Sequence, residues 1–196
     1  MVLGFTTTPG LGGIISVAGC GMLAGSLVMS IWGGPRRRIN GVLFFEMFSG
    51  VCFLLIGLRP AFWRVAVGAL GAHMTIAVVY GSNQAIWQSK GETSAQGRVF
   101  AFQQMVASAA APLAYLLAGP LAEKVFEPLL AEGGALAGTA GQLLGVGAGR
   151  GIALLFIFMG LVKITVALLG YLNPHVRNVE DELPDATSNL TTAVTA

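Results

Sequence analysis

Two sets of three polar side chains interrupt long apolar runs of this sequence at helical spacing. One run carries His73, Tyr80 and Gln84, at positions i, i+7 and i+11. The next carries Gln104, Ser108 and Tyr115, at positions i, i+4 and i+11. Each spacing places its three residues on one helical face. Hydrogen-bonding groups between apolar walls suit a drug-like ligand, so the two stripes predict a substrate cavity.

His73 lies deepest in its run, and imidazole is the side chain that most readily changes charge near neutral pH. His73 is therefore a candidate to carry or sense a coupling proton. The alternative is that the polar residues only hydrogen-bond between neighbouring helices and stabilise their packing. That alternative is favoured for Gln84 and Gln104, which lie near the ends of their runs.

Glu46 and Lys163 are the charged side chains inside apolar runs. At 1.5 Å per residue, Glu46 lies about 9 Å and Lys163 about 14 Å from the same face of a bilayer. Charges at membrane depth are costly unless they are paired. Opposite signs at similar depth therefore predict a structural ion pair. Alternatively, the Lys163 stem extends along the apolar surface and carries its ammonium group to the interface.

Five apolar runs carry these residues, and each is long enough to cross a bilayer. A hydrocarbon core of about 30 Å needs about 20 helical residues. The runs are residues 13–33, 39–58, 62–87, 99–121 and 151–172. The sequence thus predicts an all-α integral membrane protein whose transmembrane domain occupies residues 1–172. Residues 173–196 are predicted to be a disordered cytoplasmic tail, because they are acidic and then rich in Thr and Ser.

Composition supports a membrane protein and excludes several functions. Hydrophobic residues make up 55% of the chain and charged residues 10%, whereas a soluble domain has about 25% charged residues. A net charge of +2 gives no basic surface for nucleic acid. Cys20 and Cys52 both lie in apolar runs and are predicted to be buried free thiols. We expect no metal and no cofactor.

The distribution of basic residues predicts the orientation in the membrane. Alternate gaps between runs face the same side, and one set of gaps holds six of the eleven Lys and Arg residues: Arg36, Arg37, Arg38, Lys90, Arg98 and Arg177. Short loops rich in Lys and Arg stay in the cytoplasm. We therefore expect a multi-pass protein of the cell (inner) membrane, with its amino end outside and its carboxyl end in the cytoplasm.

Three backbone features have structural rather than chemical interpretations. Pro112 removes an N–H donor and clashes with the preceding turn, which predicts a static kink in the fourth helix. Gly21 and Gly25 form a G-x-x-x-G pair, which is typical of close helix packing. The stretch from Glu132 to Gly151 is predicted to be an outer loop, preceded by a short interfacial helix at residues 126–130.

The segment from Gly25 to Arg38, GSLVMSIWGGPRRR, resembles the Gly- and Arg-containing loop motif of the major facilitator superfamily. The residues that carry this likeness are Gly25, Gly33, Gly34, Arg36, Arg37 and Arg38. The later segments AIWQSK (85–90), QGRVF (96–100) and 119–128 resemble the branch of macrolide-efflux proteins and siderophore exporters.

The resemblance implies a fold and a missing part. Members of this superfamily have twelve helices in two halves, and the chain resembles helices eight to twelve. An amino-terminal half and helix seven would then lie outside it, in the same gene or in a split partner. The acidic residue of the family motif, which helps to latch the cytoplasmic gate, is replaced here by apolar residues (Val28 and Met29). The arginines are therefore interpreted as a topology anchor.

The resemblance also implies a function. It is that of a partial secondary active transporter, which exports a hydrophobic or drug-like amphipathic small molecule by proton antiport and alternating access. A non-transporting membrane scaffold or assembly subunit is the first alternative. A membrane-embedded enzyme is the second, and it is disfavoured because the sequence has no G-x-S-x-G, H-E-x-x-H or Walker motif.

Overall fold

The structure, a computed structural model, describes residues 8–35, 37–58, 61–90, 93–147 and 149–182, and these ranges contain helices and no strand. Five helices are long and apolar enough to cross a membrane. They are α1 (Thr8–Trp32), α2 (Arg38–Gly57), α3 (Phe62–Lys90), α4 (Thr93–Pro120) and α7 (Arg150–Leu172). The predicted all-α membrane class is confirmed.

The fourth helical segment is longer than predicted at both ends. It begins at Thr93 rather than at residue 99, and it does not stop near residue 121. Pro120 cannot donate an N–H, and beyond it the chain widens into the π-helical turn η1 (Leu121–Phe126). It then continues as α5 (Glu127–Leu130). The interfacial helix expected at residues 126–130 is thus the end of one continuous rod.

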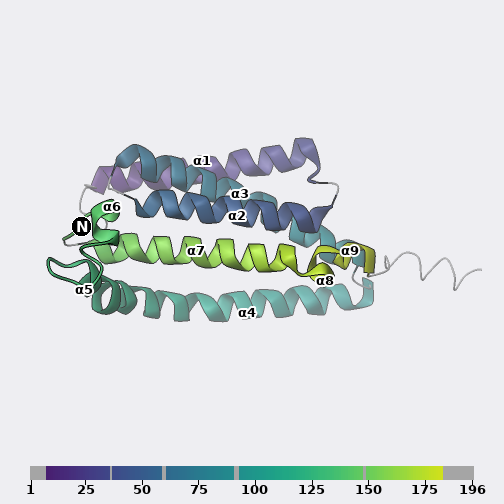
Figure 1. The fold of residues 1–196 in the computed structure, drawn as a ribbon. Helices are drawn as coiled ribbons and strands as arrows, with labels where there is room; N and C mark the ends of the chain where they lie inside the picture. Colours follow the sequence, from purple (N-terminus) through teal and green to yellow (C-terminus); the bar gives the residue numbers. More distant parts are fainter. Residues whose placement is uncertain (1–7, 36, 59–60, 91–92, 148, 183–196) are drawn as a thin grey trace, which may run out of the picture.

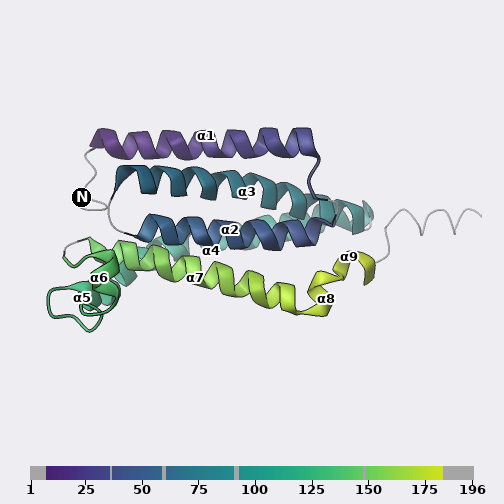
Figure 2. The ribbon, with the colours of Figure 1, turned by 45° about the horizontal axis from the view of Figure 1, so that its top comes forward.

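Four of the long helices form a single layer, in which α1 and α3 run parallel and α2 runs antiparallel to both α3 and α7. Figure 2 shows them side by side in the order α1, α3, α2, α7, and the packing contacts between neighbours follow the same order. Helix α4 lies on one side of this layer (Figures 1 and 2). The loop between α1 and α2 shares one end of the bundle with α8 (Pro174–Arg177) and α9 (Val179–Glu182). We call this end the arginine end.

Glycines let the helices of the layer approach closely. A Cβ added at Gly21 or Gly25 would overlap the backbone carbonyl oxygen of Leu70 or Met74 on α3. Gly50 of α2 faces Gly160 of α7, where an added Cβ on either would lie 2.7–2.8 Å from the other's carbonyl oxygen. The predicted G-x-x-x-G contact of α1 is confirmed, and its partner is α3.

Helix α4 is packed far less than the others. Only 6% of its most apolar 18-residue window is buried, against 44% for α3. Every residue from Gln104 to Pro120 is exposed on the surface of the bundle. The rod meets the other helices at its two ends, where for example the ring centroids of Phe126 and Phe158 of α7 lie 5.9 Å apart. Among the residues that the structure describes, no other helix covers its middle turns.

Glu127 holds the far end of the bundle together. Its two carboxylate oxygens accept hydrogen bonds from the backbone N–H groups of Gly149, at 2.6 Å, and Gly151, at 3.0 Å. These groups belong to the first turn of α7, whose N–H donors have no intrahelical acceptor. Glu127 is thus a helix cap supplied from the preceding rod.

We expect Glu127→Ala to lower the free energy of unfolding by about 1–2 kcal/mol, because it leaves both N–H groups without this acceptor. Unfolding in mixed micelles with increasing SDS, followed by circular dichroism, measures the change. Glu123→Ala, on the exposed face of η1, is the matched control and should change little. Equal losses in the two variants would contradict the capping role.

The predicted disordered tail is wrong for residues 173–182. The side chain of Asn173 accepts a hydrogen bond from the backbone N–H of His175 and caps α8, and α9 follows directly. Composition alone suggested disorder because it ignores contacts with distant parts of the chain. Residues 183–196 lie outside the described ranges.

Candidate functional site

A pocket of about 720 Å³ lies between the ends of α3 and α4 that approach each other. Helix α3 contributes Tyr80, Asn83 and Gln84. Helix α4 contributes the five residues 100–104 together with Val106 and Ala107. The pocket thus combines amide and hydroxyl groups with the aromatic rings of Tyr80, Phe100 and Phe102.

The polar groups of the pocket are hydrogen-bonded within their own helices. Gln84 Nε2 donates to the Tyr80 hydroxyl at 3.0 Å, and Gln104 Nε2 donates to Ser108 Oγ at 3.5 Å. Neither of these bonds joins α3 to α4. They therefore differ from the interhelical bonds expected if the two glutamines served only to stabilise packing.

No Asp, Glu, Lys or Arg is among the described residues that line this pocket. A charged ligand transferred from water into an apolar site needs a counter-charge, whereas a neutral amphipathic ligand needs only hydrogen-bond partners and apolar walls. The lining therefore matches a neutral compound with a few donors and acceptors.

A second groove, of about 500 Å³, lies between α1 and α3. It is lined by Met22, Ser26, Met29, Ser30, Ile76, Ala77, Tyr80 and Gly81. Tyr80 borders both this groove and the pocket, so one aromatic side chain separates them. The sequence analysis missed the α1 side of this surface. Its one available signal is the pair Met22 and Met29 at i and i+7, since methionine adapts to varied apolar ligands.

Of the six predicted cavity residues, three line the pocket and three do not. Tyr80, Gln84 and Gln104 line the pocket, and Ser108 touches it through the Gln104 side chain. Tyr115 lies farther along α4 and is 82% exposed. His73 is outside both lining sets, about 10 Å along α3 from Tyr80.

His73 is half-buried and has a defined orientation. Its Nδ1 lies 2.9 Å from the carbonyl oxygen of Ala69. A carbonyl only accepts hydrogen bonds, so Nδ1 carries the hydrogen and Nε2 is the basic nitrogen of the neutral ring. In this tautomer Nε2 is the ring atom that can accept a hydrogen bond.

Glu46 and Lys163 form an ion pair. Lys163 Nζ lies 2.6 Å from Glu46 Oε2, and the side chains are 29% and 32% exposed, in that order. Lys163 Nζ also lies 5.7 Å from the ring centroid of Phe53. The lysine therefore turns toward α2 rather than extending along the membrane surface. The pair joins α2 to α7 and contributes no atom to the pocket.

The residues that resemble the family loop motif have separate roles in the structure. Gly25 packs inside α1 against α3, whereas Gly33 and Gly34 have φ angles of +72° and +88°, which only glycine adopts readily. Arg38 Nη1 donates to the carbonyl oxygen of Ala85 at 2.8 Å. Arg37 Nη2 lies 3.4 Å from Asp181 Oδ2. Arg36 lies outside the described residues.

The cysteines differ in their surroundings. Both are free thiols, and Cys52 is buried on α2, as predicted, but Cys20 is exposed on α1. The prediction for Cys20 is wrong because α1 has a neighbour on only one side, α3. Within the described ranges, no three His, Cys, Asp or Glu side chains are grouped so that they could hold a metal ion.

Comparisons of the chain with protein families, with curated proteins and with solved structures find no match. The features of the molecule that bear on its function are the pocket, the exposed helix α4 and the arginine end.

Proposed function

We propose that the chain is the carboxyl-terminal part of a secondary transporter of the major facilitator type. It would export a neutral hydrophobic or amphipathic compound in exchange for protons, by alternating access. The observation that carries this proposal is the pocket between α3 and α4, lined by Tyr80, Gln84 and Gln104.

Polar side chains are costly at membrane depth unless they have hydrogen-bond partners or line a cavity. The amide and hydroxyl groups of this pocket are concentrated where two apolar helices approach each other. The hydrogen bonds of Gln84 and Gln104 run along their own helices and do not tie α3 to α4. A ligand that accepts and donates hydrogen bonds would supply the missing partners.

The exposed middle of α4 supports the view that the chain is one part of a larger bundle. Pro112 lacks the N–H that would bond the carbonyl of Ser108, and Gln104 and Ser108 are themselves exposed. In hydrocarbon, such polar groups need protein or water beside them. An amino-terminal half packed against α4 would cover them and would complete a cavity between two repeats.

His73 is our candidate for the coupling proton, through Nε2. The proposed orientation places the arginine end in the cytoplasm, because Arg37 and Arg38 lie in a short loop there. The membrane is then the cell (inner) membrane, with the amino end of the chain outside.

Transport of a neutral fluorescent amphiphile tests the proposal. Cells that lack their own efflux pumps would express the chain together with the upstream half. We expect these cells to accumulate at least about fivefold less N-phenylnaphthylamine than cells with either part alone, and a protonophore should abolish the difference.

Two variants assign roles within the same assay. Gln84→Leu keeps the side-chain volume and removes the amide, and should reduce export about tenfold. The control Thr165→Val changes an exposed polar residue of α7 outside the pocket and should leave export intact. His73→Ala should remove the dependence of export on the proton gradient. Unchanged export and pH dependence in His73→Ala would exclude this histidine from coupling.

The scaffold alternative is favoured by one observation, the exposed face of α4. If that face binds another membrane protein, the chain should be stable in membranes without an amino-terminal half and should co-purify with its partner. A stable chain that changes no accumulation with the upstream half present would replace the transporter proposal with this one.

A further inference from the structure

The carboxyl-terminal segment folds back onto the arginine end instead of leaving the membrane domain. Helix α7 ends at Leu172, and Asn173, in extended conformation, starts α8. The N–H groups of Asp181 and Glu182 bond the carbonyl oxygen of Asn178, which starts α9. Two short helical turns therefore carry the chain from the end of α7 to the start of α2 within ten residues. We call residues 174–182 the tail strap.

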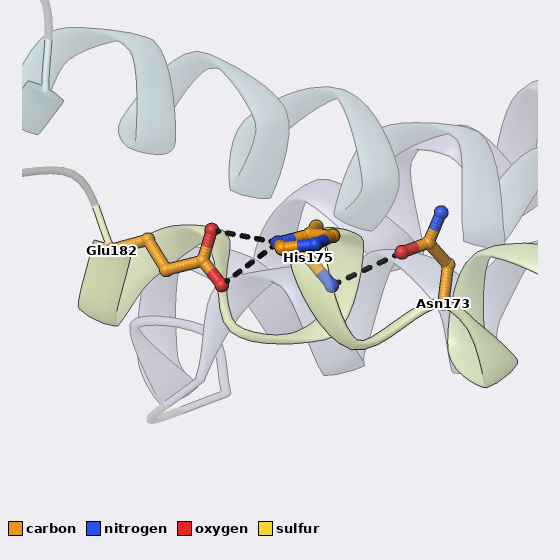
Figure 3. Close-up of polar contacts among 3 residues, drawn as sticks. All are labelled: Asn173, His175 and Glu182. Atoms are coloured by element: carbon orange, nitrogen blue, oxygen red, sulfur yellow. Dashed lines mark hydrogen bonds and ion pairs between the residues drawn. The ribbon is translucent and has the colours of Figure 1, made fainter.

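A polar contact within the strap joins α8 to α9. The Nδ1 atom of His175 lies 3.3 Å from both carboxylate oxygens of Glu182, and the side chain of Asn173 accepts from the backbone N–H of His175 at 3.1 Å. Figure 3 shows the His175 ring between Asn173 and Glu182, with the carboxylate facing the ring. This contact fixes the direction of α9 relative to α8.

The strap reaches the start of α2. Helix α2 has no side-chain cap from its own N-cap residue, Arg37. Glu180 Oε1 instead accepts a hydrogen bond from the backbone N–H of Ile39 at 3.2 Å, from 141 positions away in sequence. The first N–H groups of a helix lack intrahelical partners and attract a carboxylate. The tail therefore supplies the cap that the local sequence lacks.

A second contact joins the same two segments. Asp181 Oδ2 lies 3.4 Å from Arg37 Nη2, and the two side chains are 64% and 57% exposed. Arg38, next in the chain, bonds the carbonyl oxygen of Ala85 near the end of α3. The arginine loop is thus tied on one side to α3 and on the other to the strap.

We infer that the tail strap is a reversible electrostatic clasp that closes the arginine end by tying the last span to the loop between α1 and α2. The Arg37–Asp181 pair is exposed and the Glu180 carboxylate is only part-buried, so salt weakens both contacts and the clasp can open without unfolding the helices. This inference does not depend on transport, because it concerns the closed arrangement of one end of the bundle.

Trypsin cleavage at the arginine loop tests the clasp in the purified full chain in detergent. The variant Glu180→Gln/Asp181→Asn removes both contacts and leaves the sequence at the cleavage site unchanged. At low salt we expect it to be cut after Arg36–Arg38 about fivefold faster than the wild type. Raising NaCl should increase the wild-type rate until the two rates converge.

The control is Glu123→Gln/Glu132→Gln, which makes the same change of net charge at two exposed residues outside the strap. It should be cut at the wild-type rate. Hydrogen exchange provides a second readout that does not depend on the protease, since the amide of Ile39 should exchange faster in the strap variant. Equal cleavage rates at every salt concentration, or an Ile39 amide that exchanges as in the wild type, would overturn the clasp.

Discussion

Lys163→Ala is expected to lower the free energy of unfolding of the chain by about 3 kcal/mol, because it leaves the Glu46 carboxylate without its partner inside the bundle. Lys163 Nζ lies 2.6 Å from Glu46 Oε2, and both side chains are about two-thirds covered by protein. Both residues lie inside helices long and apolar enough to cross a membrane, where an unpaired carboxylate is costly. SDS titration followed by circular dichroism measures the effect.

The double variant Glu46→Leu/Lys163→Met removes both charges, so it distinguishes the stability that the ion pair contributes from the cost of leaving one charge unpaired. Replacing a buried ion pair by apolar residues of similar size is often nearly neutral, so we expect the double variant to be more stable than Lys163→Ala. The charge-swapped variant Glu46→Lys/Lys163→Glu should recover part of the loss. Lys124→Ala, at an exposed lysine of η1, serves as the control. If the charge-swapped protein were no more stable than either single reversal, the pair would contribute no net stability.

Gly25→Ala is expected to lower the free energy of unfolding by about 2 kcal/mol, and Gly25→Leu by more, because the new Cβ overlaps the carbonyl oxygen of Met74. Helix α1 packs closely only against α3, so no other neighbour can compensate when the two helices separate. The same SDS titration gives the loss, and a tryptophan signal from Trp32 reports on α1 itself.

Gly19→Ala is the matched control for this prediction. Gly19 lies in the same helix and is exposed, with no atom within 4 Å of an added Cβ. Alanine also favours helix more than glycine does, so Gly19→Ala should be neutral or slightly stabilising. Equal losses at residues 19 and 25 would show that the effect belongs to the helix backbone and not to the contact with α3.

The clasp and the pocket would act at the same end of the bundle. Gln84 of the pocket is the residue before Ala85, whose carbonyl oxygen binds Arg38. A movement of the loop between α1 and α2 would therefore displace Ala85, which is the residue next to Gln84 of the proposed ligand site. If the transporter proposal holds, opening the clasp provides a way to expose that site on one side of the membrane.

The sequence alone indicated that this protein lies in a lipid bilayer, and it gave the depth of the charged residues within the apolar runs. Apolar length required five membrane-spanning helices, whose number the structure reproduces. The spacing of Gly21 and Gly25 specified a close contact, and the depths and signs of Glu46 and Lys163 specified a possible pair. These features depend only on residue type, on spacing and on the helical rise of 1.5 Å per residue, so they can be read from the sequence without knowledge of tertiary contacts.

Only the tertiary structure decided which helix faces meet. In a membrane helix both faces are apolar, so periodicity gives little information about which face packs against protein. Gln104 and Tyr115 share one face of α4, but Tyr115 lies about 16 Å farther along the helix, beyond the part that lines the pocket with α3, and it is therefore left on the surface. The tail followed the same principle, since the acceptor of the Ile39 N–H lies 141 residues away and only folding brings Glu180 to it.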